Sequence, residues 1–259
     1  MTGTPVRERV WSEKLYPSWL PLMLAMGLVW RRRWWRFLVG GLNRPLIFLA
    51  LFAWNLKHAV GGVEYLQFLL PGLVVMAAVT ASYTDLVNWF TVRRTFYRVL
   101  DEYRLAPVST ASLLAGHVLA GGGKGLVVAL VVYFGGWAVA GDFSFPLLFA
   151  VQLAVVCLLF ASLAVAVAMI AGGDKDVLMF TNLVVFPMTF FCGTFFPVEQ
   201  LPGALAHFSS FLPLTAGTYN LRALALTGVG RWDWFGQSLG WLAGFYLLAY
   251  LLLNWRGHD

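Results

Sequence analysis

Two short motifs in the chain contain residue types that are used in nucleotide and acyl chemistry. The run Gly121–Gly125 reads GGGKG and suggests a phosphate-binding loop, while Gly236–Gly240 reads GQSLG and suggests the turn that presents a nucleophilic serine. The first motif lacks the four-residue spacing before Gly-Lys, and a glycine stands where serine or threonine should bind magnesium. The second motif requires a strand-to-helix turn with a histidine and an acid nearby, but here it opens an apolar helix. Neither motif predicts an active site.

The histidines and cysteines do not form a set of metal ligands. They are His58, His117, His207 and His258, with Cys157 and Cys192. The histidines never fall at a two-ligand helical spacing beside a carboxylate. Each cysteine lies in an apolar run, where an isolated thiol packs as a small hydrophobe. We therefore expect no metal site and no disulfide framework.

The composition restricts the class of protein. Of 259 residues, 60% are hydrophobic and 12% are charged, and the mean hydropathy is +0.75. A soluble domain is about half apolar and a quarter charged, so an ordinary soluble enzyme is excluded. At about 20 residues for each membrane-crossing helix, the chain has room for about six spans. In such a protein the net charge of +6 is a topology signal, and we expect no nucleic-acid partner.

Six apolar runs predict the spans. They cover approximately Phe37–Trp54, Leu66–Trp89, Ser112–Ala140, Phe145–Ala171, Val177–Phe196 and Phe235–Trp255. Together they predict an all-α polytopic membrane protein with six transmembrane helices. Residues 37–259 form one membrane domain in this interpretation, and residues 1–36 form a cytoplasmic N-terminal segment.

The N-terminal segment is expected to lie on the membrane rather than to cross it. Tyr16–Trp30 is short for a span and contains Pro17 and Pro21, which favours an interfacial helix on the cytoplasmic leaflet. The run after it reads RRRWWR and consists of Arg31, Arg32, Arg33, Trp34, Trp35 and Arg36. Guanidinium groups there would lie among phosphates, and the indoles at headgroup depth. A simple positive-inside anchor and a contact with a lipid substrate both fit.

The distribution of cations gives the orientation. Most lie before the first run, between the second and third runs, or at the C-terminus, whereas Lys57, Arg222 and Arg231 remain for the outer side. Both termini are therefore expected in the cytoplasm. Arg44 and Lys124 fall within spans, where a charge is costly. A structural pairing and a substrate-facing role are both open for these two residues.

Two connections differ from simple loops. In Thr95–Pro107, apolar residues recur at helical spacing, and charged residues occupy the other face, which predicts a short cytoplasmic helix against the bundle. Pro197–Asp233 is apolar but is interrupted by prolines. Because irregular backbone at membrane depth has to be buried in protein or line a wet cavity, we expect a re-entrant pair of short helices on the outer side.

A row of small residues marks the last span. Gly236, Gly240 and Gly244 follow the pattern that lets two membrane helices approach closely. Packing within the chain is the preferred interpretation, and dimerisation through this face is the alternative.

Three motifs in the chain resemble those of the type 2 ABC exporter permeases, and the first of them consists of two consecutive stretches. Phe186–Pro202 reads FPMTFFCGTFFPVEQLP and is followed by FLPLTAGTYNLRAL over Phe211–Leu224. Tyr103–Leu119 reads YRLAPVSTASLLAGHVL, and Phe68–Ala78 reads FLLPGLVVMAA. With the layout of the spans, they resemble the nodulation-factor exporter permease and related exporters of lipid-linked saccharides and drugs. The resemblance extends from about Arg31 to the end of the chain.

The resemblance implies a non-enzymatic half-transporter in the cytoplasmic (inner) membrane. Two permease copies, as a homodimer or with a close relative, would bind two cytoplasmic ABC ATPase subunits. ATP and magnesium would be held by those partners, and this chain would hold no cofactor. The short cytoplasmic helix would sit in a groove of the ATPase. Its coupling residues would be Arg98, Asp101, Glu102, Arg104 and Pro107. A solvated helix face is the alternative for these charges.

The resemblance also implies a route for an amphiphilic substrate, with a lipid-linked saccharide as the first expectation. The residues of headgroup contact and substrate access would be Arg31, Arg32, Arg33, Trp34, Trp35, Arg36 and Arg44. The translocation path would be lined by Phe186, Phe190, Phe191, Phe195 and Phe196. The outer gate would be formed by Pro197, Glu199, Gln200 and Pro202.

Three other functions stay open at this stage. A hydrophobic drug is the alternative substrate for the same exporter. An intramembrane enzyme acting on lipids would use Ser238, His117 or Glu199. A membrane scaffold without transport activity would not need the cytoplasmic helix.

Overall fold

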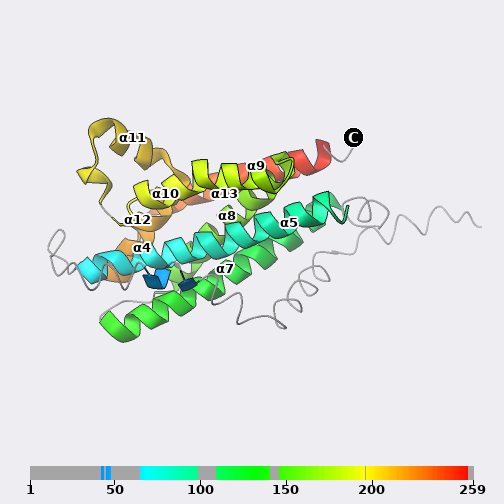
Figure 1. The fold of residues 1–259 in the computed structure, drawn as a ribbon. Helices are drawn as coiled ribbons and strands as arrows, with labels where there is room; N and C mark the ends of the chain where they lie inside the picture. The colour runs from blue at the N-terminus through cyan, green and yellow to red at the C-terminus, as the bar shows by residue number, and fades with distance from the viewer. Residues whose placement is uncertain are drawn as a thin grey trace, which may run out of the picture.

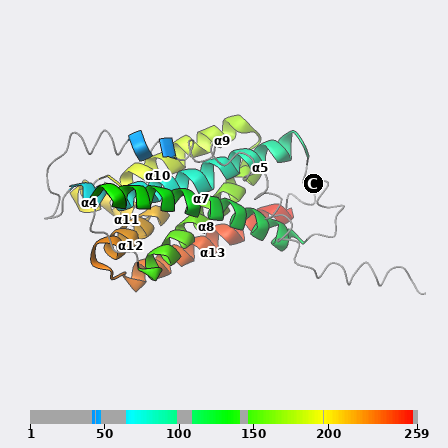
Figure 2. The same ribbon diagram turned by 90° about the horizontal axis from the view of Figure 1, so that it is seen from below.

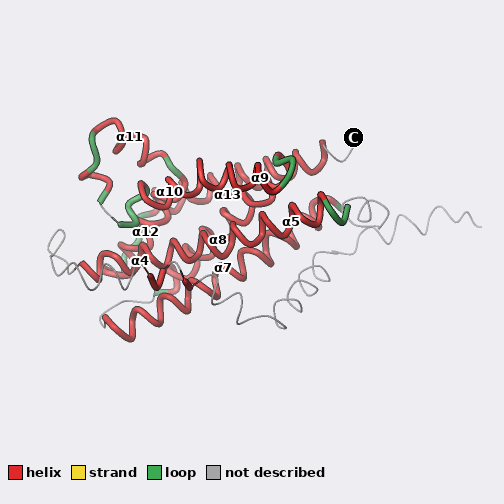
Figure 3. Tube along the Cα trace, viewed as in Figure 1, coloured by secondary structure: helices red, strands yellow, loops and turns green. Residues whose placement is uncertain are grey.

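Helices dominate the described chain, because a backbone inside a bilayer has to satisfy its own hydrogen bonds. The computed structural model describes residues 42–43, 45–47, 65–98, 109–140, 146–195 and 197–255. Within these ranges the residues form helices and short turns, and none of them is in a strand (Figure 3). The predicted all-α class is confirmed.

The elements follow one another along the chain with short connections. They are α4 (Tyr65–Val79), a π-helical turn (Thr80–Thr84), α5 (Asp85–Thr95), α7 (Thr110–Ala140), α8 (Leu147–Ile170), α9 (Asp174–Phe180), a second π-helical turn (Thr181–Val185), α10 (Phe186–Phe191), a 3₁₀ turn (Val198–Gln200), α11 (Gly203–Phe211), α12 (Pro213–Thr227) and α13 (Trp232–Trp255).

Four helical stretches of the described chain are long and apolar enough to cross a membrane. They are Gln67–Thr95, Thr110–Ala138, Leu147–Ile170 and Trp232–Trp255. These stretches confirm as helices the second, third, fourth and sixth predicted spans. The second is longer than expected, because its helix continues beyond Trp89 to Thr95.

The fifth predicted span is helical but shorter than expected. The helix runs from Asp174 to Phe191, and its first turn carries three charges, on Asp174, Lys175 and Asp176. The apolar part after them covers about 22 Å at 1.5 Å per residue, less than the about 30 Å of hydrocarbon. The turn after α10 is therefore needed to complete the apolar length of this segment.

The long helices lie side by side, with α8 in the centre (Figures 1 and 2). Helix α8 packs against α13, α7, α5, α12 and α4. Several of its side chains are fully buried, among them Phe149, Leu159 and Phe160. The start of α4 lies at the same end of the bundle as α11 and α12, which we call the α11 end (Figure 1). The ends of α5 and α13 lie at the opposite end, which we call the α5 end.

Each π-helical turn interrupts a long helix. In the second one, the Phe186 N–H bonds to the Thr181 carbonyl, five residues back. The next residue is Pro187, which has no N–H, and the wider turn accommodates its ring. In the first, the Ser82 hydroxyl bonds to the Ala78 carbonyl at 2.6 Å. The two turns are linked by Tyr83 and Thr181, whose hydroxyl oxygens are 3.4 Å apart.

The GGGKG motif is a packing face of α7. A Cβ built at Gly121 would lie 2.6 Å from the Leu86 side chain, and one at Gly125 would lie 2.7 Å from the Ser82 Cβ and 3.0 Å from the Ala78 carbonyl oxygen. A Cβ at Gly123 would have no atom of the described chain within 4 Å. Gly121 and Gly125, which are four residues apart on one face of α7, therefore let α7 pack closely against the turn after α4 and the start of α5.

These contacts predict opposite effects for neighbouring glycines. Gly125→Ala should destabilise the bundle by about 1–3 kcal/mol, because the Ala78 backbone cannot yield to the new methyl group. Gly123→Ala should be neutral or stabilising by up to about 1 kcal/mol through helix propensity. Thermal aggregation midpoints in detergent measure the difference, and equal losses for the two variants would contradict the packing.

The small-residue row on α13 has no packing partner among the described residues. A Cβ at Gly236, Gly240 or Gly244 would have no described atom within 4 Å. These glycines lie on a face that α8 and α12 do not cover, because α13 contacts both helices through other residues, such as Ser238 and Ala249.

Several predicted segments lie outside the described residues. They are the interfacial helix Tyr16–Trp30, the RRRWWR run, nearly all of the first span Phe37–Trp54 with Arg44, the cytoplasmic segment from residue 99 to Pro107, and Phe196.

Candidate functional site: two ends of the bundle and an ion pair

The predicted gate residues form one short turn at the α11 end. Pro197 and Pro202 flank the 3₁₀ turn Val198–Gln200, both with extended backbone angles, and the turn is closed by bonds from Gln200 N–H to the Pro197 carbonyl and from Leu201 N–H to the Val198 carbonyl, both 3.1 Å. Glu199 and Gln200 are exposed, whereas Val198 is 6% exposed. The turn is therefore a small unit with one side against the protein.

Tyr219 of α12 contacts this turn. Its hydroxyl accepts a hydrogen bond from the Val198 N–H at 2.7 Å and donates one to Glu199 Oε2 at 2.9 Å. Its ring lies against Gly193, where a Cβ would be only 2.6 Å from a ring carbon. Gly193 has φ of +77°, a left-handed conformation that favours glycine. Sequence reasoning identified Glu199 but missed Tyr219.

Arg222, three residues later on α12, is buried at 7% exposure. Its guanidinium donates to the Phe68 carbonyl at 3.2 Å and the Gly193 carbonyl at 2.7 Å, and it lies 3.7 Å from the centre of the Phe68 ring. The sequence places Arg222 among the cations of the outer side, and the structure adds that its side chain is buried between α4 and the turn after α10. A signal was present in the sequence, since the stretch Phe211–Leu224 that resembles the family contains this arginine.

A glycine on α4 completes this contact region. A Cβ at Gly72 would overlap the Thr194 carbonyl, so only glycine lets the turn after α10 lie on α4. We call Phe68, Gly72, Gly193, Tyr219 and Arg222 the outer cluster. It joins the start of α4, the turn 192–195 and α12.

The predicted path phenylalanines have different environments. Phe186 and Phe191 are exposed, Phe190 is half-buried, and Phe195 is buried at 1% exposure. The Phe190 ring contacts those of Phe186 and Phe195, at distances of 5.0 Å and 5.2 Å between ring centres. Phe186, Phe190 and Phe195 thus form a row from the surface of α10 to the buried turn 192–195.

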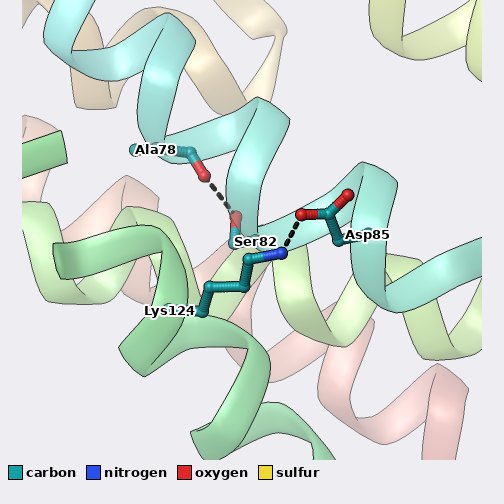
Figure 4. Close-up of polar contacts among 4 residues, drawn as sticks. All are labelled: Ala78, Ser82, Asp85 and Lys124. Carbon is teal, nitrogen blue, oxygen red and sulfur yellow. Dashed lines mark hydrogen bonds and ion pairs between the residues drawn. The ribbon is translucent and has the colours of Figure 1, made fainter. Parts of the chain in front are cut away.

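An ion pair joins α5 and α7 within the bundle (Figure 4). The Lys124 ammonium contacts the Asp85 carboxylate, with Lys124 nearly buried and Asp85 at 44% side-chain exposure. Lys124 lies near the middle of α7, and Asp85 follows the first π-helical turn directly. Lys124 therefore has a structural partner within the bundle, which is one of the two roles left open by the sequence. Because Asp85 is partly exposed, the pair can still be reached from the surface.

A hydrogen-bonded chain of amides ties α12 to α8 and α13. Asn220 donates to Gln152 at 3.1 Å, and Gln152 donates to the Ser238 hydroxyl at 3.0 Å. Ser238 donates to the Trp234 carbonyl at 2.9 Å. Sequence reasoning missed this network, although Gln152 inside an apolar run was a visible signal.

The residues considered for an intramembrane enzyme lie on separate elements. Ser238 belongs to this amide network, while His117 on α7 bonds to the Leu113 carbonyl at 2.7 Å and packs against Trp89 and Phe90. Glu199 bonds to Tyr219. No group of three or more metal-ligating side chains is found within the described part of the chain.

At the α5 end, Arg94 connects two helices. Its guanidinium donates to the Met169 carbonyl at 2.6 Å and also to the Ala171 carbonyl, which caps the end of α8. Arg98, four residues later, is exposed with φ of +48°. The other predicted coupling residues, Asp101, Glu102, Arg104 and Pro107, lie outside the described residues.

Comparison with known families identifies the kind of protein that carries these features. The profile of the family described as "ABC-2 type transporter" matches residues 22–226. The chain belongs to the ABC-2 type transporter family. Nodulation protein J of Rhizobium meliloti is 31% identical over 221 residues, covering 81% of each chain. The inner membrane transport permease YadH of Escherichia coli K12 is 25% identical over 250 residues, covering 89% of this chain and 95% of YadH.

A third relative is Nodulation protein J of Bradyrhizobium diazoefficiens, which is 30% identical over 220 residues, with 81% of each chain covered. The resemblance drawn from the sequence motifs is thereby confirmed. Both ends of the bundle described above fall within or beside the family match, which reaches from residue 22 to the end of α12.

Membership of the ABC-2 family settles three further predictions. ABC-2 permeases are transmembrane subunits without catalytic domains, so the prediction that the chain is not an enzyme is confirmed and the intramembrane-enzyme alternative is contradicted. They pair with ABC ATPase subunits. The chain is a multi-pass permease of the inner membrane.

Proposed function

We propose that this ABC-2 permease is the transmembrane half of an exporter that moves an amphiphilic, lipid-linked saccharide out of the cytoplasmic leaflet. The observation that carries the proposal is the continuous helix Tyr65–Thr95. It holds Phe68 and Gly72 of the outer cluster at one end, and it leads into the segment around Asp101 at the other. A movement imposed on that segment can therefore reach the turn at the α11 end along one helical stretch, which includes the π-helical turn Thr80–Thr84.

The proposed topology has six spans in the domain 37–259, with an interfacial helix within residues 1–36 and both termini in the cytoplasm. The α5 end then faces the cytoplasm and the α11 end faces outward, with α11 and α12 as the outer re-entrant pair. In support, α11 and α12 follow the α9–α10 helix at the opposite end from the charged turn Asp174–Asp176 (Figure 1).

The proposed assembly is a homodimer of this permease with two ATPase subunits that hold ATP and magnesium. Arg98, Asp101, Glu102, Arg104 and Pro107 contact the ATPase. In support, Arg94 ties the helix before this segment to the end of α8, so a push on the segment acts on both helices.

The proposed route starts at the inner leaflet. The basic and tryptophan run Arg31–Arg36, with Arg44, attracts the anionic headgroup of a membrane lipid-linked substrate. The phenylalanines Phe186, Phe190, Phe191, Phe195 and Phe196 lie along the route. The turn with Pro197, Glu199, Gln200 and Pro202 is the outer gate. Similarity to Nodulation protein J, and the motif resemblance to nodulation-factor exporter permeases, support a saccharide as the cargo.

The test of coupling reverses one charge at each end. Glu102→Arg should lower the substrate-stimulated turnover of the copurified ATPase several-fold, because a cation would replace an anion at the proposed contact. Asp233→Arg is the matched control at the α11 end, where the carboxylate is 82% exposed, and it should leave turnover unchanged. Full function of the isolated permease without nucleotide would contradict the proposal.

The test of cargo uses lipid extracts. Deletion of the gene should cause a lipid-linked saccharide to accumulate in the inner leaflet, detected by mass spectrometry, and re-expression should reverse it. Unchanged extracts together with increased sensitivity to hydrophobic drugs would contradict the saccharide and favour a drug.

A further inference from the structure

We propose that the Tyr219 hydroxyl is a latch that holds the turn Val198–Gln200 against α12 and keeps the outer end of the permease closed. Tyr219 is then a positioning residue for the gate. The identification of this turn as the gate rests on the proposed function above, whereas the contacts of Tyr219 belong to the fold itself.

The hydroxyl joins two rigid parts through two bonds of opposite direction. It accepts from the Val198 backbone and donates to the Glu199 side chain, so a hydroxyl is needed to make both bonds and a phenylalanine would make neither. The turn is closed internally by its two 3.1 Å backbone bonds. It is therefore expected to move as a unit about the extended residues Pro197 and Leu201.

The α12 side of the contact is fixed. The Tyr219 ring fits against Gly193, and it meets Trp234 of α13 edge-on with ring centres 5.4 Å apart. The next residue, Asn220, is bonded to α8 through Gln152, and Arg222 is bonded to the Gly193 carbonyl. Loss of the hydroxyl would leave these contacts in place, so the turn and not α12 would be released.

Burial of the turn provides a direct readout. Val198 is 6% exposed while its neighbours Glu199 and Gln200 are exposed. If the turn lifts from α12, residue 198 becomes accessible to water. A cysteine at this position keeps the backbone N–H that bonds to Tyr219, and it reports the opening by its rate of reaction with a polar maleimide.

The experiment uses the full-length chain in membrane vesicles that the maleimide enters freely, with Cys157 and Cys192 replaced by alanine and Val198 by cysteine. Tyr219→Phe should raise the labelling rate about tenfold, because two hydrogen bonds to the turn are lost while the ring stays. Glu199→Gln should label close to the parent rate, since the amide oxygen still accepts the tyrosine proton.

Two controls separate the latch from general loosening. In a chain that keeps only Cys157, which is fully buried on α8, Tyr219→Phe should leave labelling slow. An equal rise at Cys157 and at residue 198 would overturn the latch, as would an unchanged rate at residue 198 in Tyr219→Phe. The second control is the parent chain with Val198→Cys, which should label slowly because residue 198 is buried, and fast labelling there would mean that the turn is not held.

The outcome is independent of export. Labelling in open vesicles needs neither ATP nor substrate, so failure of the latch leaves the proposed exporter intact. Failure of the saccharide or ATPase tests likewise leaves the labelling result intact. Repeating the labelling on sealed spheroplasts tests the orientation, which belongs to the proposed function: label added outside should reach residue 198 of the Tyr219→Phe chain.

Discussion

Replacing Arg222 by alanine is expected to destabilise the permease by about 3 kcal/mol or more, with loss of the folded chain from the membrane. Each hydrogen bond from a charged donor contributes about 1.5–3 kcal/mol, and Arg222 makes two at 3.2 Å or less, to carbonyls on α4 and on the turn after α10. Removal also leaves a space over the Phe68 ring. Two segments that are distant in the sequence, α4 and the turn after α10, therefore lose the side chain that joins them to α12.

A conservative variant and an exposed arginine calibrate this effect. Arg222→Lys keeps the charge but not the planar fork, so it should retain only part of the stability. Arg231→Ala removes a guanidinium that is 61% exposed and weakly paired to Asp233 at 3.4 Å, which should cost less than about 0.5 kcal/mol. Unfolding in mixed detergent micelles measures all three. Equal losses for Arg222→Ala and Arg231→Ala would show that the cluster does not depend on Arg222.

Replacing Asp85 should destabilise the permease by about 3 kcal/mol, because the nearly buried Lys124 ammonium loses its counter-charge, whereas replacing Lys124 should cost less, because the remaining carboxylate is 44% exposed. Asp85→Ala removes the carboxylate that contacts Lys124, and Lys124→Ala removes the ammonium that contacts Asp85. Since the pair joins α5 to α7, either change should also loosen the contact at Gly125, which packs on the turn before Asp85.

A double-mutant cycle separates the interaction energy between Asp85 and Lys124 from the effect of each single substitution on stability. The exchange Asp85→Lys with Lys124→Asp should recover stability relative to either single reversal, with a coupling of about 1 kcal/mol or more. Asp174→Ala, on the exposed first turn of α9, is the control and should be near neutral. The same micelle unfolding measures the cycle, and strictly additive effects would show that the two charges act independently.

Helix α12 is buried although its sequence is less apolar than those of α7, α8 and α13. The amide network and the hydrogen bonds of Arg222 explain this burial. Asn220 and Arg222 lie on the same short helix, and they bond to α8 and to α4 respectively. Polar groups at membrane depth are costly unless they are paired, and these pairings fix α12 in one position. Under the proposed latch, the turn Val198–Gln200 is expected to be released without movement of α12.

The sequence by itself determined the helical class, the approximate limits of the long helices and the family. Inside a bilayer, only self-satisfied backbones are stable, so a long apolar run such as Ser112–Ala140 has to be a helix, and α7 covers Thr110–Ala140. The ordered motifs in Phe68–Ala78 and Phe186–Pro202 indicated the ABC-2 permeases, and the family match confirms them.

The tertiary structure alone decided which polar side chains meet. Hydropathy fixes that a helix crosses the membrane, but it does not fix how the helix is rotated about its axis, and this rotation determines every lateral contact. The sequence therefore left Lys124 between two roles, gave no partner for Arg222, and left Gly236, Gly240 and Gly244 between internal packing and dimerisation. Asp85, Arg222 and Tyr219 acquire their partners from segments up to 154 residues away, and those partners exist only once the helices are packed.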